Sequence, residues 1–257
     1  MQTLIVTHNF TTARMNYEIQ QDGKFKFIAT GKGEPLMLLH GLFGALSNFA
    51  DLINHFSKNY EVIVPILPLL ELDLLHTSVG GLQKFVQRFI EHRNYNNIHL
   101  LGNSLGGHVA LVHILKNPER IKTLTLTGSS GLFENGMGDT YPKRGDKEYI
   151  RKKTELTFYD PAMATDELVN EVFEITNNRL KVIKIIALAK SAIRNNLGEE
   201  LKDVKLFRYF HHRCMATFIY KMQFAIGYQV VKFFTNKWRC YSIVVTPYKA
   251  GRLFNIF

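Results

Sequence analysis

Residues 102–107 read Gly-Asn-Ser-Leu-Gly-Gly and follow directly on the apolar run at 97–101. Within them, Gly102 and Gly106 flank Ser104 in the pattern Gly-x-Ser-x-Gly. Small residues at both flanks allow the backbone to turn sharply from a strand into a helix, and such a turn exposes the central side chain. A hydroxyl held in this way can attack a carbonyl carbon. The pattern predicts Ser104 as a nucleophile, with a purely structural glycine turn as the alternative.

A nucleophilic attack on a carbonyl needs hydrogen-bond donors for the oxyanion that forms. The helix that begins after Ser104 directs its first backbone N–H groups toward that position, so the amide of Leu105 is one candidate donor. A second glycine-containing loop, His-Gly-Leu-Phe-Gly at 40–44, follows an earlier apolar run, and the amide of Leu42 is the other candidate. Gly41 and Asn103 are predicted to border the substrate, although Asn103 could equally serve only to hydrogen-bond the turn.

These turns must be held by an alternation of strands and helices. Strands are expected at five places, and helical spacing of apolar residues separates several of them. The expected strands are 25–30, 35–41, 60–67, 97–101 and 121–128. Strands that alternate with helices imply right-handed crossovers and a mostly parallel sheet flanked by helices, which is an α/β fold.

The alternation stops at about residue 133. Three helical segments follow, at 146–157, 165–179 and 180–196, the second with Thr165 as its expected N-cap. A helical block inserted after a strand of a parallel sheet is interpreted as a lid over the carboxyl edge of that sheet. We therefore divide the chain into a first core part at 16–132, a helical lid at 133–200 and a core completion of atypical sequence at 201–257.

Residues 16–205 resemble the α/β-hydrolase fold superfamily, and most closely its lidded bacterial members, the carboxylesterases and the C–C hydrolases of ring-fission products. The resemblance rests on "LLHGLFG", "LLGNSLGGHVAL", "NPERIKTLTLTGSSG" and the helical block. It implies Ser104 as the nucleophile, the amides of Leu42 and Leu105 as the oxyanion hole, and a loop-shaping role for His40. It covers about three quarters of the chain and specifies no substrate.

The superfamily places an acid and then a histidine after the nucleophile. Neither is recognisable here, because the last acidic residue is Asp203 and the last histidines are His211 and His212. Both histidines are expected in a basic, aromatic surface segment, and Glu134 is expected as a solvated residue at the hinge of the lid. A substitute role for them as base and acid is the alternative. The final strand and helix of the fold are left open.

Residues 206–257 differ in composition from the rest of the chain. They carry eight Lys or Arg and no Asp or Glu, so most of the formal net charge of +10 belongs to this tail. We expect the part that resembles the family to end near Lys205, with the remainder from a shifted reading frame, a fusion or a rearranged gene. The start of translation is left open between Met1 and Met15.

The composition excludes several other classes. No apolar run approaches the roughly 20 residues that cross a bilayer, and the N-terminus lacks the form of a signal peptide, so a cytoplasmic location is expected. Cys214 and Cys240 match neither a disulfide framework nor a zinc spacing and are expected as free thiols. No metal, cofactor or nucleic acid is predicted, and the expected partner is a small-molecule substrate. The oligomeric state is left open.

Three functions remain possible on the sequence. The first is a serine hydrolase of small esters or of carbon–carbon bonds beside a carbonyl. The second is a non-catalytic relative that binds a small ligand beneath the lid. The third is a surface-binding role for the tail, whose interleaved basic and aromatic residues suit bases or a lipid interface.

Overall fold

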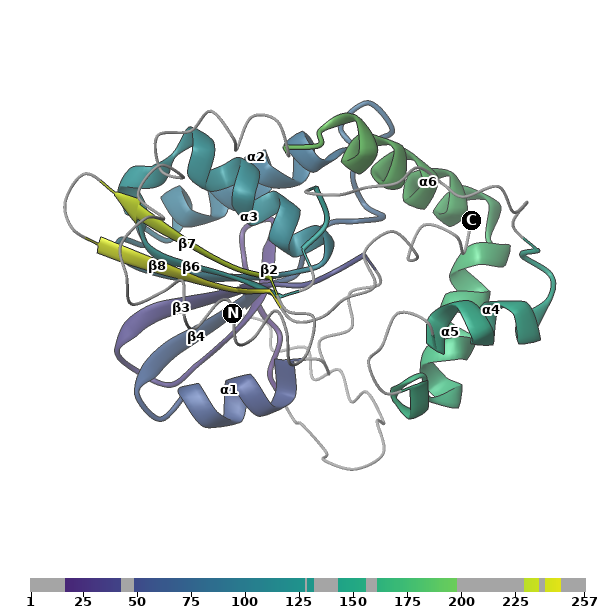
Figure 1. The fold of residues 1–257 in the computed structure, drawn as a ribbon, viewed down its shortest axis with the longest axis horizontal. Coiled ribbons are helices and arrows are strands. Elements are labelled where there is room, and N and C mark those ends of the chain that lie inside the picture. Colours follow the sequence, from purple (N-terminus) through teal and green to yellow (C-terminus); the bar gives the residue numbers. More distant parts are fainter. Residues whose placement is uncertain are drawn as a thin grey trace.

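A six-stranded sheet forms the centre of the molecule (Figure 1). The computed structural model describes residues 17–42, 49–127, 129–131, 143–155, 161–197, 229–235 and 239–245. The strands are β1 (Gln20–Asp22), β2 (Phe25–Thr30), β3 (Glu34–Leu39), β4 (Tyr60–Pro65), β5 (Ile98–Asn103) and β6 (Ile121–Thr127). Their order is β1-β2-β4-β3-β5-β6, with parallel pairing from β4 to β6 and antiparallel pairing from β1 to β4. The prediction of a mostly parallel sheet is confirmed.

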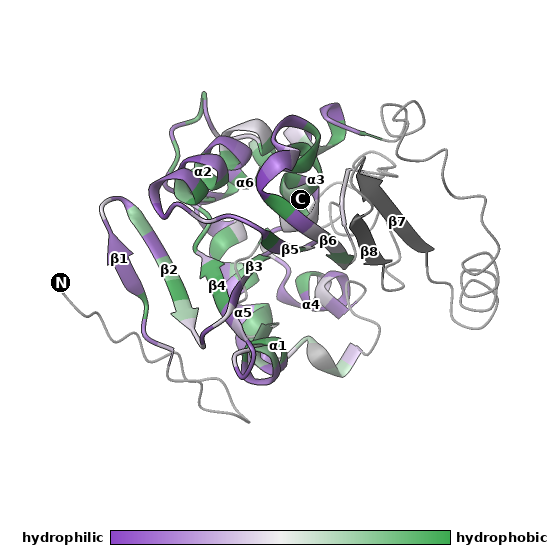
Figure 2. Cartoon of the chain, turned by 90° about the vertical axis from the view of Figure 1, so that its left-hand side faces the viewer, coloured by the Kyte–Doolittle hydropathy of each residue, from purple (hydrophilic) through white to green (hydrophobic). Residues whose placement is uncertain are grey.

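The apolar pattern of the strands explains this arrangement. In β3, the four residues from Leu36 to Leu39 are all buried, as expected for a strand covered on both faces. β2, nearer the edge, alternates more, with an exposed Lys26 between the buried Phe25 and Phe27. Figure 2 shows the same gradient, with apolar central strands and a largely hydrophilic β1.

Helices cover both faces of the sheet. α2 (Val79–His92) and α3 (Leu105–Lys116) pack on one face in the larger apolar cluster, and α1 (Ala50–Phe56) packs on the other face in a smaller one. Two short 3₁₀ helices span Pro118–Arg120 and Pro161–Met163. α3 ends just before Pro118, because proline cannot continue a helix.

Three helices follow the sheet strands, as the sequence predicted. They are α4 (Lys147–Glu155), α5 (Asp166–Asn177) and α6 (Arg179–Arg194). The hydroxyl of Thr165 accepts a hydrogen bond from the amide of Leu168 at 3.3 Å, so the expected N-cap of α5 is confirmed. Figure 1 places all three helices beyond one end of the strands. The boundaries at 132/133 and 200/201 lie outside the described residues, and the lid remains a prediction.

Hydrogen bonds attach α6 and the residues just after it to the core. The Lys184 ammonium donates to the carbonyl of Leu70 at 2.6 Å, and the amide of Val79 donates to the hydroxyl of Ser191 at 3.0 Å. Just beyond the helix, the amide of Leu197 donates to the carbonyl of Gly131 at 2.7 Å. Leu188 and Ala192 of α6 are fully buried, so this helix is part of the packed body of the molecule.

The tail contributes a hairpin that the sequence did not predict. β7 (Gln229–Thr235) and β8 (Arg239–Val245) pair antiparallel, and β8 lies beside β6 (Figure 1). The remaining expectations for the tail, among them those for His211, His212 and Cys214, lie outside the described residues, as do Glu134, Met15 and the side chain of Cys240. Among the helices of the described ranges, none has the length and apolar character required to cross a bilayer.

Candidate active site

Ser104 occupies the turn between β5 and α3 with an unusual backbone conformation. Its φ is 52° and its ψ is −119°, a region that costs free energy for any residue with a Cβ. The residue is half-buried, so it is neither packed into the core nor freely exposed. The strand-to-helix turn predicted at Ser104 is therefore present, with backbone strain at the central serine.

The two flanking glycines make this turn sterically possible. A Cβ at Gly102 would lie 2.5 Å from the carbonyl oxygen of Gly106, and a Cβ at Gly106 would lie 2.1 Å from the carbonyl oxygen of Leu39. Both obstacles are backbone atoms, which cannot swing aside as a flexible side chain can. The close approach of α3 to β3 and β5 thus requires glycine at both positions.

Hydrogen bonds to the backbone of Ser104 hold the turn in place. Its carbonyl accepts from the amide of His108 at 3.2 Å, which is the first turn of α3, and from the amide of Ser130 at 3.1 Å. The second bond comes from the segment that follows β6. Leu105 is the first residue of α3, so its amide belongs to the N–H groups that have no carbonyl partner within the helix. That end of the helix also carries its positive partial charge.

The loop after β3 passes directly against Ser104. A Cβ built on Gly41 would lie 3.3 Å from the Cβ of Ser104 and 3.5 Å from Oδ1 of Asn103. Asn103 is the last residue of β5 and is half-buried. The structure therefore brings together Gly41, Asn103 and Ser104, and it places Leu42 and Leu105 one residue beyond them along their respective segments.

His40 fixes the position of this loop. The amide of Leu67 donates to Nε2 of His40 at 2.9 Å, and Nδ1 therefore carries the proton and donates to the carbonyl of Gly41 at 2.9 Å. The ring is buried, and burial lowers its pKa below the ordinary value. A neutral imidazole with both nitrogens engaged acts as a brace, in agreement with the loop-shaping role that the resemblance implies.

A second buried histidine lies one helical turn after Ser104, and the sequence analysis did not single it out. Nε2 of His108 donates to the carbonyl of Asn195 at 2.8 Å, just after α6, and the ring lies against Gly131. Desolvation lowers the pKa of His108 to about 4, so the ring is neutral near pH 7. Its spacing of four residues from Ser104 was visible in the sequence, but its partner is 87 residues away.

No histidine of the described ranges forms a hydrogen bond with the hydroxyl of Ser104. The described imidazoles that make polar contacts make them with other groups; these are His40, His76, His92, His99, His108 and His113. Of the predicted site, the described residues therefore include the hydroxyl of Ser104, its turn, and Leu42 and Leu105, whose amides are the predicted oxyanion donors.

A cavity of about 240 Å³ lies between the core and the helices α5 and α6. Its core wall comes from the residues just after β3 and β4, and its outer wall from the two helices. The lining residues are His40, Leu42, Ile66, Leu67, Leu69, Leu70, Glu71, Glu171, Glu174, Ile175, Lys181 and Ile185. Ser104 is not among them. Leu42 connects the two features, because it lines the cavity and follows the glycine that touches Ser104.

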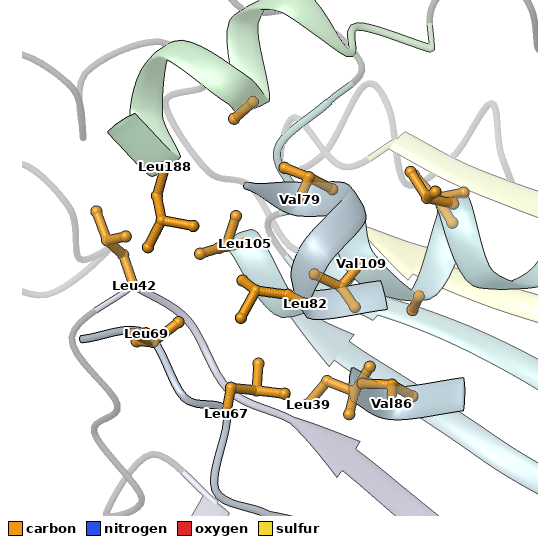
Figure 3. Packing of buried hydrophobic residues seen from close by; sticks show 14 of the residues in the cluster. Leu39, Leu42, Leu67, Leu69, Val79, Leu82, Val86, Leu105, Val109 and Leu188 are labelled. Atoms are coloured by element: carbon orange, nitrogen blue, oxygen red, sulfur yellow. The ribbon is translucent and has the colours of Figure 1, made fainter. Parts of the chain in front are cut away.

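Figure 3 shows how the apolar side of this region is built. Leu42, Leu105 and Leu188 point toward one another from the loop after β3, the start of α3 and the middle of α6. All three side chains are buried. The two residues whose amides are the candidate oxyanion donors are thus anchored by a shared apolar contact with α6.

The α/β fold, the turn at Ser104 and the loop after β3 together indicate one class of protein. Comparison with known proteins indicates the same class. The family described as the alpha/beta hydrolase fold matches residues 34–158. The crystal structure of MGS-MChE2, an alpha/beta hydrolase enzyme from the metagenome of lagoon sediments of Mar Chica, Morocco, is 38% identical with a TM-score of 0.57, over 73% of this chain and 71% of that one. The chain belongs to the α/β-hydrolase fold superfamily.

Curated relatives share a smaller part of their length with this chain. Monoacylglycerol lipase abhd6-B of Xenopus laevis is 29% identical over 130 residues, which are 46% of this chain and 39% of the lipase. The 2-hydroxy-6-oxononadienedioate/2-hydroxy-6-oxononatrienedioate hydrolase of Comamonas testosteroni is 30% identical over 160 residues, 54% of this chain and 55% of that enzyme. The chain thus spans roughly two fifths to just over half of these curated relatives.

Proposed function

We propose that this protein is a serine hydrolase that acts on small carbonyl compounds, esters or carbon–carbon bonds beside a carbonyl, through an acyl-serine intermediate on Ser104. The observation that carries the proposal is the conformation of Ser104, a non-glycine residue at φ 52° between two sterically required glycines. Strain of this kind persists only where surrounding structure enforces it, and it is typical of active sites. The relatives named above as a lipase and a hydrolase support the same class.

The proposed reaction has two steps. Oγ of Ser104 attacks the carbonyl carbon, a new C–O bond forms, and the oxyanion is held by the amides of Leu42 and Leu105. When the carbonyl re-forms, the bond to the leaving group breaks, and that group departs with the proton that the serine lost. Water then attacks the acyl-serine, which releases the acid and restores the hydroxyl.

Each described residue near the turn has a proposed part in this reaction. His40 braces the loop so that the amide of Leu42 faces the reacting carbonyl, and Gly41 leaves room beside Ser104 because a larger residue would project onto it. Asn103 borders the substrate. α5 and α6 form the lid, since they close the cavity over the ends of β3 and β4. His211, His212 and Glu134 remain predictions for substitute base and acid.

Ester hydrolysis tests the proposal. Wild-type protein and Ser104→Ala are assayed side by side on p-nitrophenyl esters of short acids, with circular dichroism to show that both are folded. We expect the substitution to lower kcat by about 10⁴-fold or more relative to an active wild type, because the nucleophile is lost. Equal residual rates in the two proteins, above the rate in buffer, would show that Ser104 is not the nucleophile.

The second candidate is a non-catalytic protein that binds a small ligand in the cavity beneath α5 and α6. It is favoured by one observation, that the histidines of the described ranges make their polar contacts away from the Ser104 hydroxyl. This candidate predicts saturable binding of an ester that is never hydrolysed. Turnover abolished by Ser104→Ala would eliminate it.

A further inference from the structure

Two segments hold the carbonyl oxygen of Ser104. The amide of His108, in the first turn of α3, donates to this oxygen at 3.2 Å, and the amide of Ser130, in the segment after β6, donates to it at 3.1 Å. The hydroxyl of Ser130 donates to the same oxygen at 3.4 Å. The strained backbone of the candidate nucleophile is therefore positioned from two sides, and a shift of either segment moves its side chain.

Both of these segments are bonded to the residues that directly follow α6. The ring of His108 donates through Nε2 to the carbonyl of Asn195 at 2.8 Å. On the other side, the carbonyl of Gly131 accepts from the amide of Leu197 at 2.7 Å. The stretch 195–197, which we call the α6 junction, thus contacts each of the two segments that hold the nucleophile.

The α6 junction is also bonded to the last turn of α6. The amide of Asn195 donates to the carbonyl of Ser191 at 3.0 Å, and the side-chain amide of Asn195 donates to the same carbonyl at 2.7 Å. The hydroxyl of Ser191 accepts from the amide of Val79, at the start of α2, at 3.0 Å. A movement of this end of α6 is therefore passed directly to the junction.

The ring of His108 occupies the point where α3, the segment after β6 and the α6 junction meet. A Cβ at Gly131 would lie 2.5 Å from Cδ2 of His108, so the ring packs directly on this glycine. Nδ1 of the ring is buried and has no hydrogen-bond partner among the described residues. A buried polar atom without a partner costs free energy, so a leucine would suit this interior position at least as well. The direction of the single hydrogen bond from Nε2 explains the imidazole better than stability does.

We propose that His108 is a positioning residue, which couples the docking of α6 to the backbone geometry of Ser104 through the α6 junction. The proposal rests on the proposed function, because it concerns how that nucleophile is presented. It assigns no proton transfer to the imidazole. Loosening of the junction slows the attack by Oγ but leaves substrate binding largely intact, because the residues of α6 that line the cavity, Lys181 and Ile185, lie in the first half of the helix.

Kinetics on p-nitrophenyl butyrate distinguish positioning from a general structural role. His108→Leu keeps an apolar side chain at this position but loses the donor. We expect its kcat to fall by about tenfold or more, with KM within about twofold of wild type. His108→Gln, whose amide can reach the carbonyl of Asn195, is expected to recover most of that loss. A glutamine variant as slow as the leucine variant, or a loss confined to KM, would contradict the proposal.

His113→Leu is the matched control. His113 is the other buried histidine of α3, and its ring contacts Gln83 of α2 at 3.4 Å instead of the α6 junction. Its replacement removes a buried imidazole from the same helix, and we expect kcat to stay within about twofold of wild type. If this variant lost as much kcat as His108→Leu does, the cause would be the loss of a buried imidazole and not the loss of the bond to the junction.

Native-state hydrogen exchange on the full chain tests the coupling without any turnover. Amides that are exposed by one opening share its free energy and its dependence on urea. We expect the wild-type amides of Ser130 and Leu197 to share both values. In His108→Leu, both are expected to exchange about tenfold or more faster relative to the amides of β3, and in His113→Leu this ratio is expected to stay as in wild type.

Two outcomes of the exchange experiment would refute the proposal. One is that the amide of Leu197 opens at lower urea in wild type while that of Ser130 stays protected. The other is that His108→Leu accelerates these two amides no more than those of β3. A wild type that hydrolyses no ester would refute the proposed function alone, because exchange reports on the coupling in either case.

Discussion

At the scale of single residues, the backbone of Ser104 is the most informative feature. Its strained conformation is held by amides from two different segments, those of His108 and Ser130, both of which donate to its carbonyl. The helix and the segment after β6 thus clamp the same atom. The packing of the surrounding core supplies the free energy that keeps the backbone of Ser104 in this strained conformation.

The glycines that allow this turn give a sharp prediction. Gly106→Ala places a Cβ 2.1 Å from the carbonyl oxygen of Leu39, so α3 must move away from β3. We expect the free energy of unfolding to fall by about 2–3 kcal/mol or more, together with most of the esterase activity. Urea denaturation and the p-nitrophenyl ester assay measure the two effects.

Gly80→Ala is the matched control, because a Cβ at this helical position would meet only the hydroxyl of Ser78 at 3.9 Å. An alanine there is expected to be neutral or to stabilise by about 0.5–1 kcal/mol. If both variants behaved alike, close approach at Gly106 would not be what shapes the turn.

Sequence reasoning reaches some of these residues and not others. The types and spacing of Gly102, Ser104 and Gly106 were sufficient to predict the turn, because its physical requirements are local. The partners of His40 and His108 could not be predicted, since they are backbone groups of Leu67 and Asn195, far away along the chain. Such contacts are fixed by how the elements pack.

At the scale of elements, α3 links the turn to the interior. Its first nine residues, from Leu105 to His113, are all buried, and two of them are histidines. Desolvation lowers the pKa values of His108 and His113 to about 4. The helix that carries the candidate nucleophile therefore contains two imidazoles that must stay neutral while the protein is folded.

The low pKa values of these buried histidines predict that the free energy of unfolding falls in mild acid. The ordinary pKa of histidine is about 6.5, so the unfolded chain binds more protons than the folded one between pH 6.5 and 4. The stabilising contribution is complete above pH 6.5 and is lost as the pH falls toward 4. In His108→Gln, whose amide can still donate to the carbonyl of Asn195, we expect this loss of unfolding free energy to shrink by roughly a third, because the rings of His40 and His113, whose pKa values burial also lowers, still contribute.

Urea denaturation at a series of pH values between 7 and 4.5 measures the effect. His55→Gln, which removes a solvent-exposed imidazole, serves as the control and is expected to keep the wild-type profile. A His108→Gln profile parallel to that of wild type would show that this ring does not titrate with unfolding.

The helices α4, α5 and α6 show what local pattern can and cannot predict. Their existence and the N-cap at Thr165 followed from apolar spacing and capping chemistry. Their docking did not, because it depends on single long-range contacts such as Val79 to Ser191, 112 residues apart. The lining of the cavity could be given only once α5 and α6 were placed opposite the segment after β4.

At the scale of the whole molecule, the parallel part of the sheet organises the site. β3, β4 and β5 all end at the same edge, and Leu42, Leu67 and Ser104 follow those three ends. Adjacent parallel strands bring such residues together however far apart they are in the chain. The fold class and this convergence were predictable, because near-continuous apolar runs alternating with helical spacing specify a covered parallel sheet.

The hairpin of β7 and β8 marks the limit of that reasoning. It was not predicted, because residues 206–257 lack the family-like pattern on which the other strands were recognised. Its pairing nevertheless places a strand beside β6, at the edge next to the segment that holds Ser104. The order of the six preceding strands does not depend on it.

The central claim is that the strained turn presents Ser104 as a nucleophile. The most direct measurement is treatment of the folded protein with a fluorophosphonate, followed by peptide mass spectrometry to locate the adduct. The account predicts one covalent phosphonyl group on Ser104, and none in Ser104→Ala. Failure of the wild type to react at any pH, or an adduct at a different residue that persists in Ser104→Ala, would contradict it.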